Sequence, residues 1–265
     1  MYDKDADFTT WYGSPPRRYI LATIPRAGST LCSIRLWQCG QLGSPLEYMN
    51  FTLAHTMWER LGYHLDGGDP SEAQIESYWR NIQKLRTSPN GVFGCKLFVC
   101  NLARLASEDP SVLSRMLPTH VVYLARRDLL GQAISYYRAQ QSHVWFGGIR
   151  YRKDQEPTYD FGGIRACLVS ICRQMAVWEK LFHAWGVAPL RLCYEELCAH
   201  PRRTVDAVRT YIGVPKEPSA RLSLPIIVRQ ADGTSEQWRA QFLRDARDAA
   251  PFESGPTSKR PASAA

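Results

Sequence analysis

The sequence predicts an α/β protein with a mainly parallel sheet flanked by helices. Four short apolar segments, partly β-branched, alternate with segments of helical periodicity, the pattern of strands covered by helices on both faces. The four expected strands are residues 19–24, 92–99, 120–125 and 190–194. A chain of 265 residues, 45% of them hydrophobic, is long enough for one such domain with a sizeable core.

The first expected strand leads directly into a turn and a helix. The turn contains Arg26 and Gly28, and the helix opens with Ser29 and Thr30. Free amides at a helix start and the positive end of its dipole favour a phosphate or sulfate group, and Gly28 allows close approach to the backbone. Ordinary capped helices share this pattern, so the loop alone leaves both interpretations open. No lysine precedes Ser29, so the GxxxxGK[ST] pattern of ATPases and GTPases is absent.

The segment between the first and second expected strands is mostly helical. Helical spacing covers residues 29–39 and 52–61, and Ser71 with Gln74 forms a capping box that opens a third helix. Residues 42–51 are expected to form a loop or a new helix start, with Pro45 placed ahead of Leu46 and Glu47. Residues 64–71, which contain Gly67, Gly68 and Pro70, are predicted to connect two of these helices.

The second half of the sequence repeats the alternation of expected strands and helices. Asp128 is expected to cap a helix over residues 129–141, and further helices are expected over 164–185 and 202–212. Residues 142–163 are rich in Trp, Tyr, Arg and Gly without a helical period, which predicts a long loop or lid. We expect a single domain over residues 19–250, preceded by an irregular arm (1–18) that contributes little to the core and followed by a disordered tail (251–265).

Charge and cysteine content limit the function classes. The net charge of +8 suits an anionic ligand, and no nucleic-acid-binding motif occurs. The eight cysteines show no CxxC pair and no zinc-site spacing, so we expect small buried thiols in a reducing cytosol and no bound metal. The N-terminus has no apolar signal region and no apolar run reaches ~18 residues, which predicts a cytoplasmic protein without membrane association.

Two basic residues are expected to meet at one edge of the sheet. Arg26 and Arg126 each follow a predicted parallel strand, and open α/β sheets bind ligands beyond the carboxyl ends of their strands. Ser135 and Arg138 lie about two helical turns further on, so a guanidinium and a hydroxyl could surround one phosphate. The alternative is an ordinary surface arginine and helix serine.

These residues carry a resemblance to known enzymes. The PRAGSTL loop, a later strand that ends in Arg and is followed by a helix with Ser, and the YEEL strand end resemble sulfotransferases that use 3′-phosphoadenosine 5′-phosphosulfate (PAPS). The blocks PLEYMNF, SPNGVFGCKL, QAISYYRAQQSHVW and RQADGTSEQWRAQF resemble the bacterial trehalose sulfotransferase family in the same order, across residues 19–248. The arm, the tail, and Arg127, where proline is expected, depart from that family.

The resemblance implies a P-loop-containing sulfotransferase fold, PAPS as donor, a carbohydrate acceptor such as trehalose or a related glycoside or glycolipid, and a homodimer. It also implies that Glu47 is the general base, and that Arg26 stabilises the departing phosphate. The expected donor-binding residues are Arg26, Ala27, Gly28, Ser29 and Thr30 for the 5′-phosphosulfate, Arg126 and Ser135 for the 3′-phosphate, and Arg229 and Gln230 closing over the nucleotide. Tyr48, Phe51 and Trp145 could stack on the acceptor sugar, although aromatic side chains more often belong to a core.

Two other classes of function share this loop. A P-loop kinase would need the missing lysine and a magnesium-binding acid, and activity retained in excess chelator would argue against it. A non-catalytic nucleotide-binding protein would share everything except the base, so Glu47 discriminates between an enzyme and a pure binder. Without the resemblance, Glu47 would be interpreted as a helix-start carboxylate that complements the helix dipole.

Overall fold

Four parallel strands form the centre of the protein. The computed structural model describes residues 1, 2, 4, 7, 8, 10–50, 53–63, 71–102, 118–145, 156–216 and 233–249. The strands are β1 (Arg17–Thr23), β2 (Val92–Phe98), β3 (His120–Ala125) and β4 (Leu190–Cys193), hydrogen-bonded in the order β2-β1-β3-β4. The predicted parallel α/β sheet is therefore confirmed.

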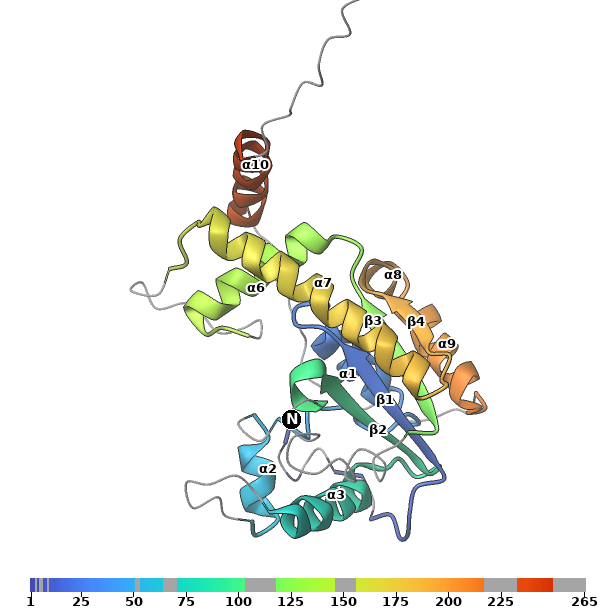
Figure 1. The fold of residues 1–265 in the computed structure, drawn as a ribbon. Helices are drawn as coiled ribbons and strands as arrows, with labels where there is room; N and C mark the ends of the chain where they lie inside the picture. The colour runs from blue at the N-terminus through green and yellow to red at the C-terminus, as the bar shows by residue number, and fades with distance from the viewer. Residues whose placement is uncertain are drawn as a thin grey trace, which may run out of the picture.

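Helices cover both faces of this sheet (Figure 1). One face packs against α1 (Ser29–Gln38), α8 (Tyr194–Ala199) and α9 (Pro201–Ile212). The other packs against α2 (His55–Arg60), α3 (Glu72–Arg86), α6 (Leu129–Ser142) and α7 (Phe161–Ala184). A last helix, α10 (Gly233–Asp248), contacts α6.

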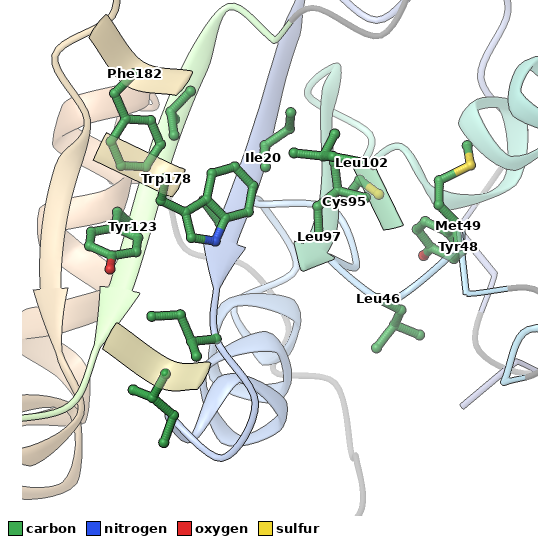
Figure 2. Packing of buried hydrophobic residues seen from close by; sticks show 14 of the residues in the cluster. Ile20, Leu46, Tyr48, Met49, Cys95, Leu97, Leu102, Tyr123, Trp178 and Phe182 are labelled. Carbon is green, nitrogen blue, oxygen red and sulfur yellow. The ribbon is translucent and has the colours of Figure 1, made fainter. Parts of the chain in front are cut away.

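Alternation along the strands explains the two layers. In β1, Tyr19 and Leu21 belong to the cluster under α1 and α9, whereas Ile20 and Ala22 belong to the cluster under α7. Successive side chains of a strand point to opposite faces, so a strand buried on both sides is apolar throughout. Figure 2 shows Trp178 of α7 lying over the sheet, and its indole N–H donates to the Thr23 carbonyl at 2.8 Å.

Local signals in the sequence placed several helix ends correctly. Ser71 and Gln74 form both hydrogen bonds of the capping box, and the Asp128 carboxylate accepts from the Gly131 amide. Helix α7 begins before the expected residue 164, because Asp160 caps it by accepting from the amides of Gly162 and Gly163. The expected lid, 142–163, therefore shrinks at both ends, and its residues 146–155 lie outside the described part.

Of two other expectations, one is confirmed over the described residues and one is wrong. Of the loop and the helix start that were the alternatives for residues 42–51, the described residues 42–50 form the loop, in which Leu46 makes a parallel bridge to Cys95 beside β2. The N-terminal arm does contribute to the core: Met1, Tyr2 and Phe8 pack against the same cluster as α2 and α3. The domain limits at residues 19 and 250 stay predictions, and the tail 251–265 lies outside the described residues.

Candidate functional site

The loop between β1 and α1, residues 25–30, is named the donor loop here. Arg26 and Gly28 both have left-handed backbone angles, with φ of 64° and 81°. A Cβ on Gly28 would overlap the ring of Tyr194, so only glycine fits between this loop and the end of β4. No side chain caps α1, and its first turn carries no acidic residue. The amides of that turn have no partner within the helix, and such free amides can bind an anion.

Arg26 joins the donor loop to α6. Its Nε donates to Ser135 Oγ at 3.0 Å, and its Nη1 donates to the Trp145 carbonyl at 2.5 Å. Gln132 of the same helix donates to the Pro25 carbonyl at 2.8 Å. The structure thus brings together Arg26 and Ser135, two residues that the sequence analysis assigned to one ligand from positions 109 residues apart.

Arg126 lies at the carboxyl end of β3 with its side chain 13% exposed. Its guanidinium sits over the Tyr194 ring at 5.2 Å, and its Nη2 donates to Asp128 Oδ2 at 3.1 Å. Its Nε is buried and makes no hydrogen bond to any described residue, since Glu195 Oε1 is 3.9 Å away. Buried guanidinium nitrogens are normally hydrogen-bonded, so this atom suits an incoming anionic oxygen.

Glu195 fixes the chain beneath Arg126. Its carboxylate accepts from the amides of Arg127 and Asp128 at 3.2 and 3.3 Å, and from the Cys193 thiol at 2.9 Å. Burial alone would raise the pKa of Glu195, but these hydrogen bonds outweigh it and hold the pKa below its usual value. The ionised carboxylate of Glu195, in the YEEL segment, therefore fixes the turn that follows Arg126.

Glu47 lies in the bend after the Leu46 bridge and is only 7% exposed. Its Oε1 is 2.8 Å from Lys96 Nζ, and its Oε2 accepts from Asn50 Nδ2 at 3.0 Å. Lys96 Nζ also donates to Thr30 Oγ1 of the donor loop at 3.4 Å. One lysine therefore connects the predicted base to the loop predicted to hold the donor.

Lys96 is the functional candidate that the sequence analysis missed. It is 2% exposed in the middle of β2, and the amide of Lys96 donates to the Leu46 carbonyl at 2.9 Å, which brings Glu47 alongside. A lysine flanked by apolar residues in a predicted buried strand was the available signal, because buried charges are almost always paired.

The two described aromatic candidates for the acceptor site differ in their exposure to solvent. Tyr48 is fully buried, its hydroxyl donates to the Ser44 carbonyl at 2.5 Å, and its ring packs on Phe93. A sugar platform needs an exposed ring face, so Tyr48 is a core residue and its assignment to the acceptor site is withdrawn. Trp145 is 41% exposed next to Arg26 and stays a candidate.

The remaining predicted site residues either lie outside the described residues or contact other parts of the protein. Phe51, Arg229 and Gln230 are outside the described residues. Arg138 donates to Ser235 Oγ of α10 at 2.7 Å and lies over the Trp238 ring. All eight cysteines are free thiols, but only Cys32, Cys95 and Cys167 are buried.

No described helix combines the length and apolar character that crossing a bilayer requires. Within the described ranges, His, Cys, Asp and Glu side chains form no group of three that could hold a metal ion.

Comparison with known proteins identifies the family of the chain. A family model, Stf0 sulphotransferase, matches residues 18–245. Trehalose 2-sulfotransferases of Mycolicibacterium smegmatis and Mycobacterium tuberculosis are each 27% identical to the chain. The first alignment covers 89% of this chain and 98% of the relative, and the second covers 87% and 96%.

Two solved structures are also similar. The sulfotransferase domain of the curacin biosynthetic pathway has 15% identity and a TM-score of 0.43, with 78% of this chain and 77% of that chain covered. The sulfotransferase domain of the Synechococcus PCC 7002 olefin synthase has 16% identity and a TM-score of 0.42, with 79% and 78% covered.

Proposed function

We propose that this chain, which belongs to the Stf0 sulphotransferase family, transfers the sulfuryl group of PAPS to a hydroxyl of a carbohydrate acceptor. Trehalose, or a related glycoside or glycolipid, is the proposed acceptor, because the two mycobacterial relatives are trehalose 2-sulfotransferases. The observation that carries the proposal is the link from Glu47 through Lys96 to Thr30, which sets a carboxylate beside an anion-binding loop.

The residues around the donor loop suit the two charged ends of PAPS. The amides of Gly28, Ser29 and Thr30 and the Arg26 guanidinium would hold the 5′-phosphosulfate. Arg126, with its buried and unbonded Nε, and Ser135 would hold the 3′-phosphate. When bound, PAPS supplies a sulfuryl group attached to a phosphate leaving group. Donors aimed at that phosphate stabilise the negative charge that develops as it departs.

Glu47 is the proposed general base. The acceptor oxygen forms a new bond to sulfur while the bond from sulfur to the phosphate oxygen breaks, and the acceptor's proton passes to the Glu47 carboxylate. The products are a sulfate ester and adenosine 3′,5′-bisphosphate. Lys96 would hold the Glu47 carboxylate in place before the acceptor arrives, because its ammonium lies 2.8 Å from Glu47 Oε1.

Replacing Glu47 by glutamine tests this function. Glutamine keeps an oxygen for Lys96 and a similar shape, but it cannot accept a proton. The assay measures transfer from labelled PAPS to trehalose and to a panel of other glycosides. Turnover with the acceptor that the wild type uses should fall by at least ~10², whereas the affinity for adenosine 3′,5′-bisphosphate should stay unchanged. Glu76→Gln, a partly exposed carboxylate of α3 paired with Arg80, is the matched control and should leave turnover unchanged.

The competing functions give different outcomes in the same assay. A fall in turnover of less than about threefold would make Glu47 structural and move the search for a base to His55, His64 and His143. Loss of turnover in excess chelator would indicate a metal-dependent reaction of kinase type. Nucleotide binding without transfer to any acceptor would indicate a non-catalytic binding protein.

The proposal includes a homodimer, which follows from the sequence resemblance. Light scattering at micromolar concentration should give about twice the chain mass of 30.2 kDa. A mass near 30.2 kDa would contradict the dimer without affecting the proposed chemistry.

A further inference from the structure

The N-terminal arm is anchored to the domain by a buried charge cluster. The Asp7 carboxylate contacts Arg60 Nη1 at 2.7 Å and Arg86 Nε at 3.1 Å, and the Arg86 side chain is completely buried. The amides of Phe8 and Trp11 donate to the carbonyls of Leu85 and Lys84 at the end of α3. These contacts fix the arm at Asp7 and in the residues that follow it.

The first two residues of the arm reach the proposed base. Arg86 Nη1 donates to the Met1 carbonyl at 3.1 Å, and the Tyr2 ring meets the Tyr48 ring edge-on at 6.4 Å. The Tyr2 hydroxyl oxygen accepts from the Glu47 amide at 3.3 Å. The described residues offer that amide no second acceptor, so Tyr2 satisfies the backbone of Glu47 while Lys96 and Asn50 satisfy its carboxylate.

The environment of Tyr2 agrees with this arrangement. Burial raises its pKa well above the usual value, and the nearby Glu47 charge raises it further. The hydroxyl therefore stays neutral and cannot repel the carboxylate. The arm lies outside residues 18–245, the part of the chain that matches the family model, so this support for Glu47 is an addition to the matched domain.

We propose that the arm is a strap beside the bend that carries Glu47 and that Tyr2 is a positioning residue for Glu47; this rests on the proposed role of Glu47 as base. The bend that carries Glu47 has no helix of its own to hold it. Its position depends on the Leu46 bridge to β2 on one side and on the strap on the other. Without the Tyr2 hydroxyl, the carboxylate would sample positions from which the acceptor proton is out of reach.

The test replaces Tyr2 by phenylalanine in the full chain, which removes one oxygen and keeps the ring. Tyr12→Phe is the matched control, because Tyr12 is on the same arm and its side chain is 85% exposed. Three measurements are compared with the wild type: hydrogen exchange of the peptide that contains the Glu47 amide, kcat with PAPS and trehalose, and affinity for adenosine 3′,5′-bisphosphate.

In Tyr2→Phe we expect faster hydrogen exchange at the Glu47 peptide, a kcat about 3- to 10-fold lower and unchanged nucleotide affinity. In Tyr12→Phe we expect all three quantities to match the wild type. Unchanged exchange and kcat would overturn it, as would an equal loss of kcat and nucleotide affinity, which indicates general loosening. If exchange accelerates but the wild type sulfates no acceptor, the strap holds and the proposed function fails. If Glu47→Gln keeps full turnover while Tyr2→Phe accelerates exchange, the strap holds and only the base assignment fails.

Discussion

Lys96 shows how a buried charge is tolerated in the core. Its side chain is 3% exposed and that of Glu47 is 8%, so both charges are removed from water, and each depends on the other. A buried ion pair often contributes little net stability, but the loss of one partner leaves an uncompensated charge. The Lys96 and Glu47 pair is therefore better explained by its position beside the donor loop than by stability.

A double-mutant cycle tests this explanation. Lys96→Met should lower the free energy of unfolding by about 3–5 kcal/mol, because the Glu47 carboxylate loses its buried partner. Combining it with Glu47→Gln removes the stranded charge, so the double variant should be more stable than Lys96→Met alone. Urea denaturation of the single and double variants measures both quantities. Additive losses would mean that the two side chains are not coupled.

At the residue scale, chemistry-bearing positions next to strand ends were predictable and positions within the core were not. Arg26 and Ser135 could be assigned to one place because the carboxyl ends of parallel strands share an edge. Lys96 was hidden in a block that otherwise fitted a buried strand. Tyr48 was misassigned because an aromatic side chain has the same sequence signal in a core and in a sugar site.

At the scale of elements, Asp128 joins three parts of the chain. Its carboxylate accepts from the Gly131 amide at the start of α6 at 2.9 Å, from Arg126 after β3 at 3.1 Å, and from Arg239 of α10 at 2.5 Å. Burial raises the pKa of Asp128, but the Arg239 and Gly131 hydrogen bonds and the nearby positive charges outweigh it and lower the pKa. Helix α10 is thereby tied to the residue that presents the proposed 3′-phosphate site.

The lowered pKa gives the docking of α10 a definite pH dependence. A carboxyl group whose pKa is lower in the folded state stabilises that state above its ordinary pKa of about 3.9, and this contribution disappears as the pH falls through the folded value. Hydrogen-exchange protection of α10, corrected for intrinsic rates, should stay level from about pH 7 to 5 and decrease in stronger acid.

Asp128→Asn should reduce the protection of α10 from about pH 7 to 5, where wild-type Asp128 is charged, because asparagine has no charge for Arg239. Asp248→Asn, at the exposed end of the same helix, is the control. Equal protection in Asp128→Asn and wild type at neutral pH would show that Trp238 and Phe242, not the ion pair, hold the helix in place.

Elements with a local signal were predictable, and those fixed by distant partners were not. The capping box at Ser71 and the cap at Asp128 are written in adjacent residues. The position of Glu47 depends on a bridge between Leu46 and Cys95, which lie 49 residues apart along the chain. The sequence analysis predicted no helix over the residues of α10, because the contact of this segment with α6 could not be known from the sequence.

At the scale of the whole molecule, the strand order determines where the site lies. The chain adds β2 on one side of β1 and then crosses to add β3 on the other. The connections after β1 and β3 therefore diverge, and open α/β sheets bind ligands at the carboxyl edge beside such a point. The parallel sheet was predictable from alternation, whereas the order of its strands and the docking of the arm depend on contacts between distant segments.

Because Arg26 is about 100 residues away from Arg126 and Ser135 along the chain, a ligand that contacts all three links distant segments and stabilises the fold. A ligand that binds only the folded state adds about 2.7 kcal/mol at 100 times its Kd, which corresponds to a rise in Tm of about 5–10 °C for a chain of this size. Adenosine 3′,5′-bisphosphate should therefore raise the Tm well above the value in equimolar AMP, which lacks the 3′-phosphate.

Arg126→Ala tests which contact produces that difference. Loss of a charged hydrogen bond should remove about 1.5–3 kcal/mol of the bisphosphate's advantage, so the two nucleotides should give similar Tm values in this variant. Arg127→Ala is the matched control, because that side chain is 66% exposed and pairs with Glu196 on the surface. Equal Tm shifts by both nucleotides in the wild type would contradict a 3′-phosphate site at Arg126. A difference that persists in Arg126→Ala would place the 3′-phosphate site at another group, because removal of the guanidinium removes the charged hydrogen bonds that it can donate.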